Sequence, residues 1–158
     1  MRRLNHLTRR FFGSLAARRP TSTEQSFVAG LLTDSEAEVF WSQPVPDLDH
    51  AVRSAQSVAT AAPGRVDLAR AALLHDVGKR LSGTGTVGRS MATVLSAARL
   101  PTPGRMGSYL DHARLGAEEL ESLGCEDLVV QFARHHHGIR PTHIAAGDWE
   151  ILLDADDE

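Results

Sequence analysis

Residues 69–83 read ARAALLHDVGKRLSG, and this stretch determines how the rest of the sequence is interpreted. It begins as an apolar helical face of alanines and leucines, then places His75 and Asp76 side by side, followed by a glycine and Lys79. A buried ionised carboxylate destabilises a protein by several kcal/mol unless it is paired or bound to a cation. The stretch therefore predicts a buried helix end that holds a compensating positive charge.

The composition around this stretch is typical of one globular domain. The chain has 158 residues, of which 42% are apolar and 23% charged, so it is long enough to bury a core. Its single cysteine, Cys125, excludes an internal disulfide and favours a reducing compartment. No apolar run approaches the ~20 residues of a membrane span, and no signal-peptide pattern follows the basic start. We expect a cytoplasmic protein.

The charges are distributed unevenly along the chain. Residues 1–20 hold six arginines and no acid, whereas residues 148–158 hold six acids and no base. The basic start has two interpretations: an amphipathic helix that contacts an anionic membrane surface, or a terminal helix whose apolar side chains pack on the domain. Nucleic acid is not an expected partner, because the basic stretch is short and the remainder is acidic. We divide the chain into a basic segment, 1–22, and a domain, 23–158.

Helix signals dominate the domain, and no alternating apolar run is long enough to predict a strand. Ser35 and Glu38 have the spacing of a capping box, and Asp47 is a candidate N-cap after Pro46. A glycine-rich loop follows the His-Asp pair. The sequence thus predicts an all-α bundle of about seven or eight helices, over residues 21–32, 34–43, 46–62, 65–79, 89–100, 107–124, 126–138 and 149–158.

Histidines and aspartates recur at the ends of these separate helices. Each alone has an ordinary interpretation, such as a hydrogen-bonded core histidine or a solvated acid. Together they predict a metal site, because helix ends meet in an antiparallel bundle and imidazole with carboxylate suits Fe, Mn, Co, Ni or Zn. No thiolate set is present, which argues against a structural zinc finger. The candidates are His50, His75, Asp76, His112, the run His135, His136 and His137, and the late acids Asp154, Asp156 and Asp157.

These motifs resemble those of the HD-domain metal-dependent phosphohydrolases over about residues 45–157. LLHDVGK resembles the family signature, HARLGAEEL its HPxxGAexL helix, and ARHHHG its later histidine pair. The resemblance implies two divalent transition-metal ions bridged by Asp76. The first ion would be held by His50, His75, Asp76 and Asp156, and the second by Asp76, His112, His136 and His137. Asp154 is the rival of Asp156, Asp157 is a weaker one, and a register slip of one would bring in His135.

The resemblance also implies a function, hydrolysis of a phosphoester or phosphoanhydride, with a nucleotide as substrate. Asp76 and Lys79 would be catalytic, and a positive group near the ions would stabilise the charge on the transferring phosphoryl group. Substrate contacts are expected from Lys79, Arg80, Arg89 and Arg140. The glycine-rich loop 83–88 is either a plain surface loop or one that closes over phosphate.

Other interpretations remain open. The segment after the histidines, GIRPTH, lacks the Gly-Tyr-Pro motif of cyclic-dinucleotide phosphodiesterases. The chain also resembles small stand-alone HD phosphohydrolases, including dinucleoside tetraphosphate hydrolases, and a group of short actinobacterial HD proteins. The alternative function is a regulatory module that binds metal and nucleotide without turnover. A third possibility is a metal that only stabilises the fold.

Overall fold

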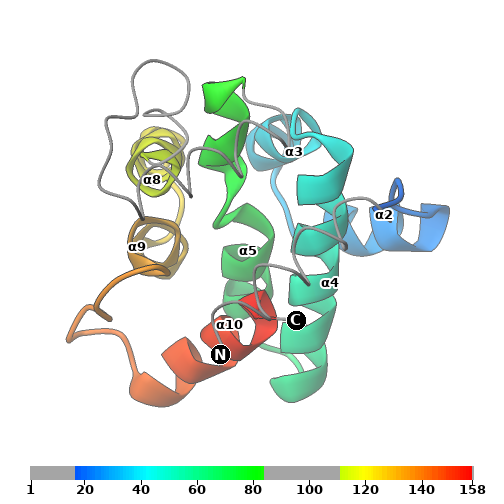
Figure 1. Ribbon diagram of the computed structural model, residues 1–158. Coiled ribbons are helices and arrows are strands. Elements are labelled where there is room, and N and C mark those ends of the chain that lie inside the picture. The colour runs from blue at the N-terminus through cyan, green and yellow to red at the C-terminus, as the bar shows by residue number, and fades with distance from the viewer. Residues whose placement is uncertain (1–16, 84–110, 158) are drawn as a thin grey trace, which may run out of the picture.

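The computed structural model describes residues 17–83 and 111–157, and all regular secondary structure within these ranges is helical (Figure 1). The predicted all-α fold is confirmed, with no strand in the described residues. The predicted helix 89–100, Arg89, most of the glycine-rich loop and residues 1–16 lie outside them. The elements are α2 (Ser22–Ala29), α3 (Asp34–Trp41), α4 (Val45–Ala61), α5 (Val66–Leu74), the 3-10 helix η1 (Val77–Ser82), α8 (His112–Ser122), α9 (Asp127–His135) and α10 (Ala146–Asp156).

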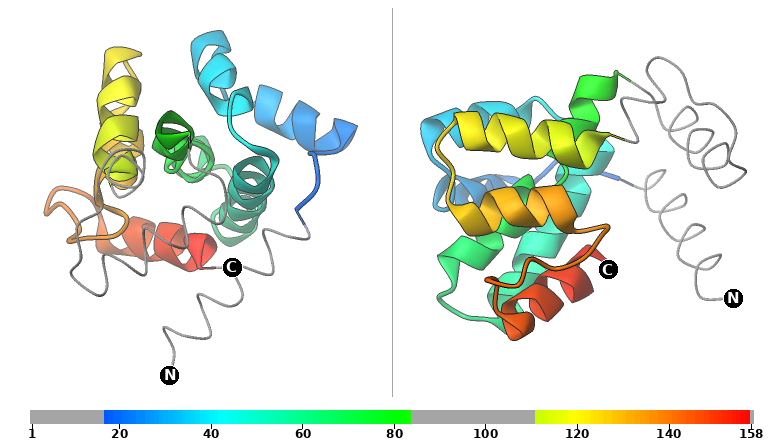
Figure 2. Two further views of the ribbon diagram at one scale, coloured as in Figure 1. Left: turned by 45° about the horizontal axis from the view of Figure 1, so that its top comes forward. Right: turned by 90° about the vertical axis from the view of Figure 1, so that its left-hand side faces the viewer.

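Helix α5 forms the centre of the bundle. It lies between α4 and α9, and α10 packs across its end (Figure 1). Its alanines and leucines are buried around nearly the whole helix, as expected of a helix with neighbours on several sides. Helix α8 runs beside α9 and also packs on η1 (Figure 2). None of the helices in the described residues is long and apolar enough to cross a membrane.

Helix α10 begins three residues before its predicted start at Trp149, and two predicted helix caps are wrong. The capping box of α3 is formed by Thr33 and Glu36, which exchange backbone–side-chain hydrogen bonds, and not by Ser35 and Glu38. Helix α4 begins directly after Pro44, so Asp47 lies in its first turn and is not the N-cap. In both cases a second residue with suitable cap or proline chemistry stands just upstream, and the sequence pattern alone did not separate the two.

The predicted continuous helix over 65–79 is also wrong, and this difference shapes the site. Helix α5 ends at Leu74, and Asp76 has φ −104° and ψ 5°, outside the helical region. The backbone then turns into η1, which packs against α8. The break lets His75 point back toward the bundle core while Asp76 is carried toward the start of α8.

Candidate metal centre

Five parts of the fold bring the candidate ligands to one end of the bundle. His50 lies on α4, His75 and Asp76 in the turn after α5, and His112 at the first position of α8. The histidine run closes α9, and the late aspartates close α10. The expectation that helix ends meet is thus matched by the geometry, and the ligand atoms fall into two groups that share Asp76.

The first group contains His50, His75, Asp76 and Asp156, whose candidate ligand atoms all lie within 4.8 Å of one another. Asp156 Oδ1 lies 3.0 Å from His50 Nε2 and 3.1 Å from His75 Nε2. His75 Nε2 is also 3.4 Å from Asp76 Oδ2. Two carboxylates and two imidazoles therefore face one small space.

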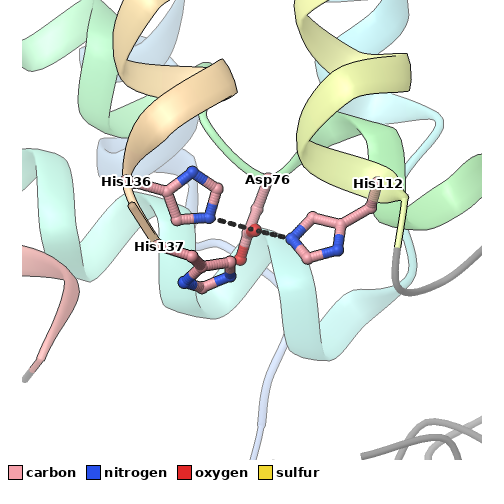
Figure 3. Close-up of side chains that lie close together, drawn as sticks. All are labelled: Asp76, His112, His136 and His137. Carbon is pink, nitrogen blue, oxygen red and sulfur yellow. Dashed lines mark ion pairs between the residues drawn. The ribbon is translucent and has the colours of Figure 1, made fainter. Parts of the chain in front are cut away.

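The second group contains Asp76, His112, His136 and His137, again with ligand atoms within 4.8 Å of one another. Asp76 Oδ1 lies 3.3 Å from His112 Nε2 and 3.5 Å from His136 Nε2 (Figure 3). Figure 3 shows the Asp76 carboxylate between the rings from α8 and α9. His137 is the exposed member, whereas the other three are buried. Asp76 thus offers one oxygen to each group.

Backbone carbonyls fix the orientation of two histidines. His75 donates from Nδ1 to the Ala72 carbonyl at 2.8 Å, and His136 donates from Nδ1 to the Ala133 carbonyl at 3.0 Å. A carbonyl oxygen only accepts, so in the neutral ring Nε2 carries the lone pair. That lone pair faces carboxylate oxygen in both groups, an arrangement that a shared cation stabilises. Histidines that ligate metals are commonly oriented in this way by their other nitrogen.

The electrostatics of the groups also favour a cation. Burial opposes ionisation of Asp76 and Asp156. Lys79 and the surrounding histidines outweigh this effect at Asp76, and His75 and His50 outweigh it at Asp156, so the pKa of each carboxyl lies well below its usual range. Burial likewise disfavours charge on His75, yet the two carboxylates raise its pKa to about 10. When no metal is bound, a proton on His75 balances part of the negative charge of the two carboxylates. The donor set and this negative charge suit divalent transition metals.

The rival ligands lie outside both groups. Asp154 and Asp157 are exposed, while Asp156 is buried between His50 and His75. His135 is partly exposed and belongs to neither group of candidate ligand atoms. The geometry therefore favours Asp156 with His136 and His137, the assignment expected from the sequence.

The predicted substrate-binding cations have different surroundings. Lys79 is buried and its Nζ forms an ion pair with Asp76 Oδ2. Arg80 forms an ion pair with Glu119 of α8, and Arg140 donates to the carbonyls of Pro141 and Ile144 in its own loop. Arg89 lies outside the described residues. Lys79 is therefore the one of these three described cations that directly contacts a candidate metal ligand.

Phe132 is a contributor that the sequence analysis missed. Its buried ring lies 5.5 Å from the His75 ring and 5.8 Å from the His136 ring, measured between centroids, and it also packs edge-to-face with Trp149. The signal was present, because Phe132 and His136 are four residues apart at the end of one helix and so share a face. The ring limits how far either imidazole can rotate.

An all-α bundle that gathers two His/Asp groups around one shared carboxylate has the donor set of a helical metal-binding protein. The HD domain family matches residues 47–152, two thirds of the chain, and the chain belongs to this family within the metal-dependent phosphohydrolase superfamily. HD domains bind divalent metals and are generally hydrolases. Asp156 lies beyond the matched range, so its assignment rests on the geometry. The comparisons with curated proteins and with solved structures gave no match.

Proposed function

We propose that this chain is a binuclear metal-dependent phosphohydrolase that cleaves a phosphoester or phosphoanhydride, with a nucleotide as substrate. The observation that carries the proposal is the sharing of Asp76 by two complete four-residue groups. Two ions about 3.5–4 Å apart suit hydrolysis, because such a pair supplies a water of lowered pKa and clamps phosphoryl oxygens.

The chain's own residues have definable tasks in this proposal. Asp76 holds the two groups together through its separate oxygens. The Ala72 and Ala133 carbonyls fix His75 and His136, so that each keeps Nε2 directed at the site. Lys79, already beside Asp76, supplies positive charge to a phosphoryl oxygen as negative charge develops there. His137, exposed at the edge of the second group, marks the side from which substrate enters.

The nucleotide preference rests on the motif resemblance. Arg140 belongs to the loop after the histidine run and is partly buried by its contacts with loop carbonyls. A guanidinium there suits a second phosphate, because it can donate two parallel hydrogen bonds. We expect substrates with at least one phosphoanhydride to be preferred over simple monoesters.

The proposal is tested by elemental analysis of untagged protein beside Asp76→Ala, with both proteins assayed on an aryl phosphate and a nucleotide panel. We expect close to two transition-metal ions per chain, and the loss of metal and turnover together in Asp76→Ala. Asp154→Ala, which removes an exposed carboxylate of α10, is the matched control and should keep both. Metal without turnover on any substrate would instead support a regulatory module that binds metal and nucleotide.

A further inference from the structure

Helices η1 and α8 cross at two glycines that lie next to the metal ligands. Gly78 follows Asp76 by two residues, and Gly116 lies one turn after His112. Both glycines are buried at the crossing. The backbone that carries the shared carboxylate therefore lies directly against the backbone that carries the first histidine of the second group.

No side chain fits between the two backbones at this crossing. A Cβ on Gly78 would overlap the His112 carbonyl oxygen and lie 2.6 Å from the Gly116 nitrogen. A Cβ on Gly116 would lie 2.9 Å from the Gly78 nitrogen and 3.2 Å from its Cα. Backbone atoms cannot rotate away as a flexible side chain can, so a methyl group at either position has to push η1 and α8 apart.

An ion pair closes the same contact. Arg80 of η1 binds Glu119 of α8, and Glu119 lies three residues after Gly116, on the same face of the helix. The adjacent Glu118 points elsewhere: it pairs with Arg114 of its own helix at 2.8 Å, and both side chains are about half exposed. Of these two neighbouring glutamates of α8, Glu119 binds η1 and Glu118 does not.

We propose that the Gly78–Gly116 contact and the Arg80–Glu119 pair form a positioning element that sets the distance between Asp76 and His112, and so controls binding of the second metal ion. The inference rests on the binuclear site of the proposed function and assigns Arg80 to positioning. The first group depends less on α8, because His50 and Asp156 come from α4 and α10, which pack on each other. Displacement of α8 should therefore weaken the second group selectively.

The first test is a cobalt(II) titration of metal-free protein, followed by calorimetry. The wild-type chain should bind two ions. Gly116→Ala should keep the first and bind the second about 10- to 100-fold more weakly, the size of effect seen when groups that orient metal ligands are changed. Gly147→Ala is the control, since a Cβ at this exposed helical glycine meets nothing within 4 Å, and it should match the wild type. A folded Gly116→Ala that binds both ions with wild-type affinity overturns the inference.

The second test does not depend on Gly116→Ala folding. Glu119→Gln removes the ion pair with η1, and Glu118→Gln removes only the surface pair. We expect Glu119→Gln to weaken the second ion about tenfold, within the range for such orienting groups. Glu118→Gln should have no effect, and the exchanged pair Arg80→Glu with Glu119→Arg should restore part of the affinity. A purely structural role would lower the melting temperature of Glu119→Gln and leave the second ion unchanged, which contradicts the inference.

The outcome separates the inference from the proposed function. A wild-type chain that binds two cobalt ions but hydrolyses no phosphate compound disproves the hydrolase proposal, and the selective effect of Gly116→Ala still supports the positioning element. A wild-type chain that binds only one ion overturns the positioning element, because there is then no second ion to control.

Discussion

The two groups that share Asp76 differ in charge and in exposure. The first group adds a second carboxylate, Asp156, and its histidine His75 is fully buried. The second group adds only imidazoles, and one of them, His137, is exposed. Because a divalent cation is attracted more strongly by two carboxylates than by one, we expect the first group to bind its ion more tightly. The second group should hold the ion that exchanges with solvent and meets the substrate.

Among changes that affect one group and not the other, Asp156→Ala should have the largest effect. This change removes the carboxylate that only the first group has, and leaves His50 and His75 facing Asp76 alone. We expect the tight ion to be weakened more than about 100-fold, beyond the range of changes that only reorient ligands. Stepwise metal titration by calorimetry measures this directly.

The control for this prediction is Asp154→Ala on the same helix, which should titrate like the wild type. If Asp156→Ala instead weakens only the looser ion, the ranking of the two groups is wrong. The shared carboxylate would then be the main source of affinity in the first group.

A smaller effect is expected from His137→Ala. The side chain is exposed, and three buried ligands remain in its group. We expect the looser ion to be weakened on the order of tenfold, which corresponds to about 1.4 kcal/mol. The tight ion should be unchanged, and KM for substrate should rise with the loss of the looser ion.

The neighbouring His135→Ala is the matched control, because His135 belongs to neither group. An effect of His135→Ala equal to that of His137→Ala would show that the histidine run binds in another register. Equal weakening of both ions by His137→Ala would contradict the separation of the two groups.

The candidate ligands could be proposed from the sequence because ligand chemistry and the glycines that end helices are local properties. The His-Asp pair, the histidine run and the glycine stops all appear within short stretches. The choice of Asp156 over Asp154 was left open, since both acids precede the chain end and only three-dimensional packing buries one of them.

The helix break at the His-Asp pair could not be predicted in the same way. The stretch after Leu74 contains no proline, and Gly78 lies three residues too late to mark the end of α5. The break is followed by the close contact of Gly78 with Gly116, two residues 38 positions apart. The same long-range contact brings Arg80 to its partner Glu119 on α8. From the sequence alone, Arg80 was assigned to substrate binding. Such tertiary contacts override local helix propensity.

The smallest effect is expected far from both groups, at Glu24 of α2. Hydrogen bonds from Arg18 and from the backbone of Thr21 lower the pKa of Glu24 to about 2. A carboxyl whose pKa falls on folding stabilises the protein above its unfolded pKa of about 4.3, and this contribution declines as the pH falls toward the folded value. Glu24→Gln should therefore lower the stability of metal-free protein near pH 6 by about 1 kcal/mol, as loss of a helix cap does.

The difference in stability between Glu24→Gln and the wild type should shrink as the pH falls below about 4.3. The control is the exposed Glu38→Gln, which should show no such trend when melting is followed by circular dichroism. A Glu24→Gln variant that also weakens either metal ion would mean that α2 is coupled to the centre, and the contrast between the two groups would no longer be a local property of their ligands.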